Sequence, residues 1–405
     1  MNTLATPQVQ LQIEGRLHSA NSTELGASIG NAYSRRHRPR CMCTSTGAEM
    51  YIARLGDGYL VKRMPGTGSE HAPTCPSYEP AAEFSGLAQV LGTAIVEDPE
   101  TGLTQLRLDF PMSKGTKRLP SALAGEPSSS AKSSGTRLSL RGLLHYLWDQ
   151  ADLSSWSPDQ KDGRTWPFVR NMLLRAMTCK TLCGRQLSQQ LYIPEPFFVD
   201  RREAINARRA FSWQVAQSGP LGRSAMILII AELKELAPTR FGHRALVKHL
   251  PDTPLLVDEQ LFRKMSRQFG EDLLLWGASD ALRAILIGTL VVGTNGTAQL
   301  NEVSLMLTNQ AWTPVANVYE QQLLDLLMSE GRSFNKPLAY NLARSAELPS
   351  ALLKDAGPNI VPLQITLAGE PLSNCGRPGP IESHWHWDPS QSASIPPFPS
   401  TAGSS

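Results

Sequence analysis

Apolar and polar residues alternate in several short stretches of the first hundred residues, which is the period of a half-buried β-strand. Asp57-Gly58 stands between two such stretches, and Asp-Gly is a strong signal for a tight hairpin turn. Residues 24–36 are predicted to form a helix. Extended segments are predicted at residues 9–17, 51–54, 59–63 and twice within 87–108. The N-terminal part of the chain is therefore predicted to be rich in β-strands.

The pattern changes between residues 120 and 136, where Ser, Ala, Gly, Pro and Lys dominate. This composition is typical of a flexible connection. Apolar residues then recur at helical spacing from about residue 138 to residue 216, as in the run Leu140, Leu143, Leu144 and Leu147. A helical region is predicted there.

Longer apolar runs return after Gly222, and those at 226–230 and 284–292 indicate buried strands. Thr294-Asn295-Gly296 predicts a hairpin turn between the strands at 284–292 and 298–307. Strands joined by tight turns pair in the antiparallel sense, and helices then cover one face of the sheet. Further strands are predicted at 225–235, 244–250 and 359–367, and helices at 258–278 and 318–328.

These patterns predict a multidomain α+β protein whose C-terminal half carries an antiparallel sheet with helices. The tail is too rich in Pro and Ser to be expected to pack. The predicted division is a β-rich module with a metal site at 1–119, a flexible linker at 120–137, a basic helical region at 138–222, an α+β domain at 223–370 and a disordered tail at 371–405.

The composition supports folded domains inside a cell. A chain of 405 residues is long enough for two or three folded units, and 41% hydrophobic residues supply ordinary cores. The N-terminal segment lacks the basic and apolar regions of a secretory signal, and no apolar run approaches the ~20 residues that cross a bilayer. The sequence therefore predicts a cytoplasmic protein without a membrane partner, in which the six cysteines bind metal or stay free.

Two short pairs of metal-ligand residues are the clearest chemical feature. Cys41 and Cys43 form the first pair, and His71 and Cys75 form the second after a gap of 27 residues that holds the predicted hairpin. Structural zinc takes four thiolate or imidazole ligands at tetrahedral positions and leaves no position for water or substrate. The four residues therefore predict a structural zinc site. The alternative is a buried thiol cluster with a surface histidine, and without His71 the metal would have an open position.

At these residues the chain resembles a known family. The segment RCMC, the segment GYLVKRMP and the pattern H.P.C are followed by LLHYLWDQADLSSW, LYIPEPF, INARR and VKHLPD. They are similar to an uncharacterised bacterial family catalogued as domain of unknown function 1173, which is described by three N-terminal cysteines. The similarity extends to about residue 370. Because members are typically encoded on integrative and conjugative elements of proteobacteria, the resemblance implies an accessory role in a mobile genetic element, with other proteins of that element as partners. It supplies no catalytic residue.

Positive charge is concentrated in residues 161–224, which hold eleven Lys or Arg and four acids, a net charge of +7 in a chain whose total is +3. A concentrated basic surface is what binding to nucleic acid phosphates requires, and arginine favours bidentate phosphate contacts. The sequence therefore predicts binding to DNA or RNA. In the alternative, these arginines pair with acids of the protein itself or of a protein partner. The predicted nucleic-acid-binding residues are Arg175, Arg185, Arg201, Arg202, Arg208 and Arg209.

The common enzyme motifs are missing from the sequence. It has no phosphate-binding loop, no dinucleotide-binding glycine motif and no nucleophile elbow. One arrangement remains, because Glu232 and Lys234 lie two residues apart on a predicted strand and resemble the Mg²⁺-binding acid and the lysine of Glu-x-Lys nucleases. The second acid that such a nuclease needs is not evident, and Asp200 is the nearest candidate. The sequence thus favours an accessory binding protein without catalysis, with a Mg²⁺-dependent nuclease and a pure protein-interaction scaffold as alternatives.

Overall fold

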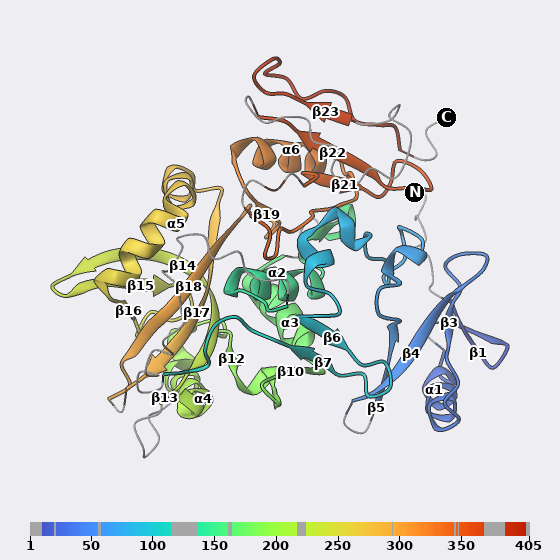
Figure 1. Cartoon of the computed structure of the whole chain (residues 1–405), viewed down its shortest axis with the longest axis horizontal. Coiled ribbons are helices and arrows are strands. Elements are labelled where there is room, and N and C mark those ends of the chain that lie inside the picture. The colour runs from blue at the N-terminus through green and yellow to red at the C-terminus, as the bar shows by residue number, and fades with distance from the viewer. Residues whose placement is uncertain are drawn as a thin grey trace, which may run out of the picture.

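The computed structural model shows a mixed arrangement of helices and strands with several sheets (Figure 1). The predicted linker between residues 120 and 135, the residues Gly56-Asp57 and the residue Thr294 lie outside the described residues. The structure describes residues 10–19, 22–55, 58–114, 136–160, 164–216, 224–293, 295–343, 346, 348–367 and 385–401.

Five strands of the largest sheet pair in a closed ring and form a small barrel. The ring order is β14, β15, β16, β18, β17 and back to β14. A long helix connects β16 to β17, and β12 and β19 extend the sheet. The bounds are Leu191–Tyr192 for β12, Ile227–Thr239 for β14, Gly242–Val247 for β15, Leu255–Val257 for β16, Glu259–Ala278 for α5, Arg283–Val292 for β17, Ala298–Thr308 for β18 and Pro314–Val315 for β19.

The apolar runs found in the sequence are buried strands of this barrel, as predicted. Ile227 and Ile229 belong to one hydrophobic cluster, whereas Leu228 and Ile230 belong to another. Alternate residues of a strand point to opposite faces, so β14 is buried on both sides. Because both faces of β14 are buried, its apolar residues follow one another along the sequence and do not alternate with polar ones.

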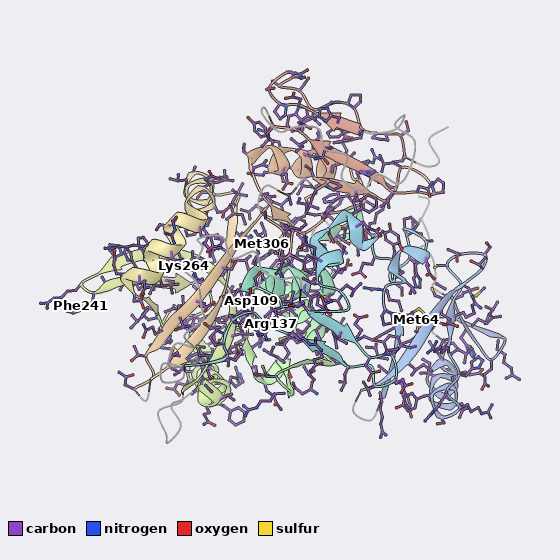
Figure 2. The ribbon with its side chains drawn as sticks, in the orientation of Figure 1. Met64, Asp109, Arg137, Phe241, Lys264 and Met306 are labelled. Atoms are coloured by element: carbon purple, nitrogen blue, oxygen red, sulfur yellow. The ribbon has the colours of Figure 1, made fainter. Side chains whose placement is uncertain are left out.

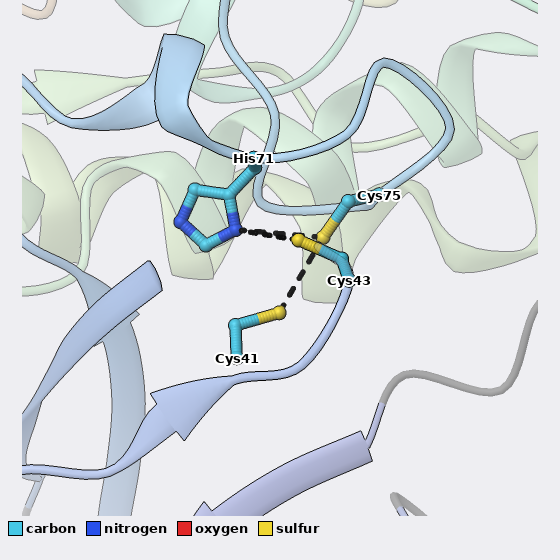
Figure 3. A group of neighbouring side chains, drawn as sticks. All are labelled: Cys41, Cys43, His71 and Cys75. Carbon is cyan, nitrogen blue, oxygen red and sulfur yellow. Dashed lines mark hydrogen bonds between the residues drawn. The ribbon is translucent and has the colours of Figure 1, made fainter. Parts of the chain in front are cut away.

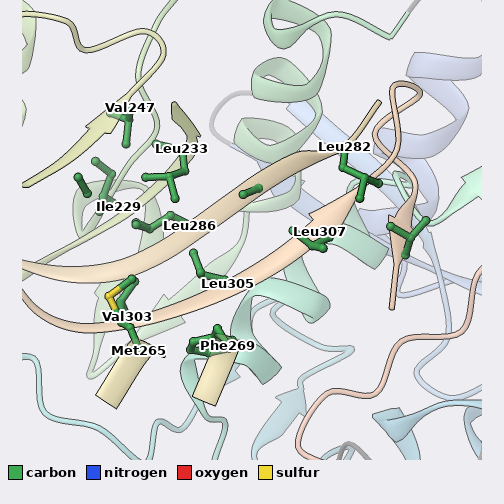
Figure 4. Close-up of a cluster of buried hydrophobic side chains, with 14 of the residues drawn as sticks. Ile229, Leu233, Val247, Met265, Phe269, Leu282, Leu286, Val303, Leu305 and Leu307 are labelled. Atoms are coloured by element: carbon green, nitrogen blue, oxygen red, sulfur yellow. The ribbon is translucent and has the colours of Figure 1, made fainter. Parts of the chain in front are cut away.

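The first cluster fills the barrel and extends to the helix that follows β16 (Figure 4). Leu233, Leu286 and Leu305 from three strands meet Met265 and Phe269 of α5 there. Helix α5 begins where Asp258 accepts a hydrogen bond from the Leu261 amide at 2.8 Å, which is a standard N-cap. The helix predicted at 258–278 is thus confirmed, with a kink at Phe269, whose φ of −124° is not helical, and its apolar face packs on the barrel.

The second cluster joins the outer face of the barrel to a helical layer. Leu143, Leu144 and Trp148 of the first helix in this layer share the cluster with Ile285 and Ile287 of β17. The predicted helical region and the predicted C-terminal domain therefore share one core. The layer contains α2 at Leu140–Gln150 and α3 at Trp166–Ala176. Helix α4 at Arg202–Trp213 contributes Trp213 to the first cluster instead. The short strands of this part of the chain are β6 at Ile95–Glu97, β7 at Thr104–Leu106, β8 at Ser113–Lys114, β10 at Lys180–Leu182, β11 at Arg185–Gln186 and β13 at Ser224–Ala225.

The N-terminal region forms its own five-stranded sheet with one helix. Residues 9–17, predicted as one strand, instead contribute to a hairpin, because Glu14 and Gly15 take positive φ angles of 48° and 79° and turn the chain. The sheet order is β2, β1, β3, β4, β5. The bounds are Gln10–Ile13 for β1, Arg16–Ser19 for β2, Leu25–Ser34 for α1, Arg40–Cys41 for β3, Ala48–Leu55 for β4 and Gly58–Arg63 for β5.

A further five-stranded sheet contains residues of the predicted tail. Trp385 and Trp387 are 9% and 1% exposed in a strand that pairs with its neighbour in parallel. The prediction that this part of the tail does not pack is wrong, because two tryptophans offset the poor packing of Pro and Ser. The bounds are Ser155–Trp156 for β9, Val318–Ser329 for α6, Phe334–Asn335 for β20, Ala351–Leu353 for β21, Val361–Ile365 for β22 and Trp385–Trp387 for β23.

The pairing in the barrel sheet is mixed and not wholly antiparallel as predicted. The strands β17 and β18 form the predicted antiparallel hairpin. However, β16 pairs with β18 in parallel, as does β12 with β14. Both parallel pairs join strands separated by long connections. Turn signals between consecutive strands predict only antiparallel hairpins, so they do not reveal these pairs. No helix among the described residues is long and apolar enough to cross a membrane.

Candidate metal centre and nucleic-acid interface

The two predicted ligand pairs come together in the N-terminal region (Figure 3). Cys41 ends β3, and Cys43 follows two residues later. His71 and Cys75 lie in the loop after a short 3₁₀ helix at Gly68–Glu70. One sulfur or nitrogen atom from each residue lies within 4.8 Å of all the others. The four residues are close enough to bind a metal ion.

Three of the six distances between ligand atoms are close to those around a tetrahedral ion. The Cys41 and Cys75 sulfurs are 3.7 Å apart, and His71 Nδ1 lies 3.4 Å from the Cys43 sulfur and 3.7 Å from the Cys75 sulfur. Zinc bonds of ~2.3 Å to sulfur and ~2.0–2.1 Å to nitrogen place tetrahedral ligand atoms roughly 3.5–3.8 Å apart. The donor set therefore fits zinc in both chemistry and spacing.

Backbone amides also point at the sulfurs. The Ala72 amide donates to the Cys43 sulfur and the Ser77 amide to the Cys75 sulfur, both at 3.4 Å. Such donors favour the thiolate that a metal requires. The hydrogen bond between Cys41 and Cys75 is the largest cause of both of their pKa shifts. The pKa of Cys75 is lowered to about 5, and the pKa of Cys41 is raised.

His71 is buried in this cluster, with only 2% of its surface exposed. Its Nδ1 faces the sulfurs, while its buried Nε2 has no hydrogen-bond partner among the described residues. The alternative with a surface histidine is therefore wrong. With Nδ1 directed at the cluster, Nε2 is the nitrogen left to carry the proton of a neutral imidazole ligand.

The arginines of α4 and of the preceding 3₁₀ helix at Val199–Arg201 lie beside the barrel. Arg202 forms an ion pair of 2.8 Å with Asp252, which lies in the connection between β15 and β16. Arg208 donates two hydrogen bonds to Glu195 at 2.9 and 2.8 Å. Arg201 is 70% exposed along its side chain, with its guanidinium 5.5 Å from the Phe198 ring centre.

The other predicted arginines differ in their surroundings. Arg209 is half-buried, with its guanidinium 5.4 Å from the ring centre of Trp213. Arg175 is exposed in the last turn of α3, and Arg185 is exposed on β11. Of the other residues in the charge count, Lys161, Asp162 and Arg223 lie outside the described residues.

The residues of the nuclease alternative are not arranged around an open site. Glu232 is 3% exposed, and its Oε1 accepts hydrogen bonds from Lys248 at 2.6 Å and Arg283 at 2.9 Å. Lys234 is exposed further along the strand, and Asp200 is exposed beside Arg201. A Mg²⁺ ion at Glu232 would compete with two side-chain cations.

The sequence patterns did not predict one exposed surface, which consists of the outer face of β15 and β16 and the hairpin loop before β15. Arg244 of β15 and Leu256 of β16 are register partners and both are exposed. Phe241, in the loop between β14 and β15, is 85% exposed. The only signal for this surface in the sequence was a phenylalanine between Arg240 and Gly242 in a turn.

The fold and the Cys/His cluster define the class of the protein, and a family model defines its family. The chain is a mixed α/β protein with a Cys₃His cluster and a small barrel, and neither a curated protein nor a solved structure matches it. The sequence model of the family described as "Protein of unknown function (DUF1173)" matches residues 11–389. The protein therefore belongs to this family, as the resemblance predicted.

Proposed function

We propose that the protein binds nucleic acid without catalysis and that a structural zinc ion holds its N-terminal module. The observation that carries the first part is the barrel. Its ring order, with the long helix α5 between the third and fourth strands, is that of the OB-fold. OB-folds bind oligonucleotides or oligosaccharides on the face of their second and third strands, here β15 and β16. Because fold alone does not imply function, the charges of this face decide between the ligands.

Those charges favour phosphate. Arg244 lies on the open face, and the ion pair between Arg202 and Asp252 places the α4 arginines beside the connection of the same two strands. The pairs made by Arg202 and Arg208 are exposed on the arginine side, and exposed ion pairs contribute only ~0–1 kcal/mol. Phosphates can therefore replace the carboxylates at low cost.

The zinc part of the proposal rests on the ligand geometry and on the small core around it. Seven buried residues make up the N-terminal cluster, and Cys41 and Cys75 are two of them. A core of this size gains little from burial alone. A bound zinc ion would supply the missing cross-links between β3 and the loop that contains His71.

Fluorescence anisotropy with labelled DNA and RNA tests the binding. We expect saturable binding at low salt whose affinity falls steeply as salt rises, because phosphate contacts release counterions. Replacing Arg201, Arg202, Arg208 and Arg209 together by Ala should weaken binding and flatten the salt dependence. Arg16→Ala, which removes an exposed charge from β2, is the matched control.

Two outcomes would contradict this proposal. Absence of binding to every probe at low salt would leave the interaction scaffold as the better account. Mg²⁺-dependent cleavage that is lost in Glu232→Gln would favour the nuclease. The mobile-element setting implied by the family resemblance remains a prediction.

A further inference from the structure

The ligand of the barrel face can be specified further, on the condition that the proposed nucleic-acid binding holds. We infer that this face binds a single strand, and that an unpaired base stacks on Phe241. Three features carry the inference: the exposed aromatic ring, the close packing of the turn that presents it against β16, and the cationic and apolar side chains exposed on the outer face of β15 and β16.

Phe241 projects away from the body of the protein at one end of the molecule (Figure 2). Its ring is 85% exposed, and the Arg240 guanidinium lies 5.1 Å from the ring centre. An aromatic ring in water exposes apolar surface that a nucleobase can cover. An adjacent arginine can neutralise the phosphate of the stacked nucleotide.

The turn that holds Phe241 has little freedom. Gly242 has a φ angle of 126°, and a Cβ atom there would lie 2.6 Å from the Val257 carbonyl oxygen. The backbone of the turn is thus packed directly against the end of β16. Such close packing fixes the point at which Phe241 leaves the sheet, because any other residue at position 242 would collide with β16.

The surface beyond the turn suits a strand with separated bases. Arg244 and the 38% exposed Leu256 lie side by side in register on the outer face of β15 and β16. Helix α4, which the ion pair between Arg202 and Asp252 places beside the β15–β16 connection, carries Arg208 and the 74% exposed Phe211. Cations and exposed apolar side chains thus occur together. A duplex offers only its phosphates to such a surface because its base faces are stacked inside, whereas a single strand offers both.

The test compares a labelled single-stranded oligothymidylate with a duplex of the same length, using the full chain in anisotropy titrations. We expect the single strand to bind at least about 10-fold more tightly. We expect Phe241→Leu to weaken single-strand binding by roughly 10-fold and to leave duplex binding unchanged, because stacking on one aromatic ring contributes ~1–3 kcal/mol. Phe241→Tyr should retain the affinity. Leu274→Ala, which removes a 76% exposed apolar side chain from α5, should have no effect.

A second measurement reports stacking directly and does not depend on affinity. In Phe241→Trp, single-stranded DNA should quench the fluorescence added by the new tryptophan, whereas duplex DNA should not. Equal affinity for both probes, or full affinity of Phe241→Leu with no quenching in Phe241→Trp, would overturn the single-strand inference while the proposed function stands. Failure of every probe to bind the unmodified protein would instead remove the proposed function.

Discussion

The N-terminal module and the barrel are both small β-structures, but they differ in the size of their apolar cores. The module has five strands around seven buried residues and places three cysteines and a histidine at its centre. The barrel ring also has five strands, but its interior is continuous with a large apolar cluster and its outer face packs on a helical layer. The barrel is buried on two sides, whereas the described core of the module is much smaller, and on the proposed function a zinc ion stabilises it.

The two regions should differ in how strongly the loss of a single side chain affects them. Burial is spread over many side chains, so each contributes only a few kcal/mol. Metal ligation concentrates a large free energy in four bonds, so losing one ligand affects the whole module. The two regions should therefore respond very differently to a chelator, to a core cavity and to pH.

Metal removal should have the largest effect. Chelation, or the Cys41→Ala substitution, should abolish hydrogen-exchange protection in the N-terminal sheet, because apparent binding free energies of structural zinc are on the order of 10 kcal/mol. Strands β14 and β17 should remain protected. Hydrogen exchange with mass spectrometry checks both regions in one experiment.

Cys183→Ser is the control for this experiment, because Cys183 is exposed and is not part of the cluster. Elemental analysis should find close to one zinc ion per chain in this variant. Protection of the N-terminal sheet that survives complete zinc removal would show that the module does not depend on a metal.

A core cavity should have the second largest effect and should act on the barrel. Leu286 is fully buried in β17 (Figure 4), and Leu286→Ala should lower the free energy of unfolding by about 2–5 kcal/mol. The zinc content should not change. Urea denaturation measures the loss, and a simultaneous loss of zinc would mean that the two regions are not independent in this respect.

A pH effect should follow from Asp149, which lies between the two regions. Its carboxylate lines a cavity of about 170 Å³ together with Arg63 and Glu79 of the N-terminal segment, and it accepts a hydrogen bond from the Tyr340 hydroxyl at 2.6 Å. Burial is the main cause that raises the pKa of Asp149 to about 7, with smaller contributions from the charges of Glu79 and Asp152 and against the lowering effect of the hydrogen bonds from Ser154 and Tyr340.

The sign of this effect follows from the raised pKa of the folded state. Below the unfolded pKa of ~3.9 the carboxyl is protonated in both states, and its contribution to stability is fully present. As pH rises from there toward 7, only the unfolded chain releases the proton, so the free energy of unfolding falls by at most about 1.4 kcal/mol per pH unit. Asp149→Asn should remove that slope. Urea denaturation of both proteins between pH 5 and pH 8 measures it, and parallel pH profiles would contradict the assignment.

The smallest effect should come from a helix cap on the barrel side. Asp258→Ala removes the side chain that accepts the Leu261 amide at the start of α5 and should cost about 1 kcal/mol. Thermal unfolding should detect the shift, and Asp258→Asn should retain most of the stability. A loss as large as that of Leu286→Ala would indicate that α5 depends on its cap more than on burial.

The local features of the chain were predictable from the residues. The helix predicted at 258–278 and the hairpin predicted around Asn295-Gly296 depend on neighbours within a few positions, and the structure confirms both elements. The metal ligands were also visible, because two short pairs separated by a hairpin must meet if the hairpin forms. The family was recognisable from the same motifs.

The sequence by itself thus determined most of the longer strands and helices and the set of candidate metal ligands, because each depends on short-range spacing. Closure of the barrel depended on the pairing of β14 with β17, whose residues are more than 50 positions apart, and no local pattern encodes such a pairing. The same holds for β23, whose tryptophans pack only because a distant strand is available. Only the tertiary structure decided that Phe241, Arg244 and the α4 arginines lie on or beside one barrel, because the folding of distant segments sets which surfaces stay open.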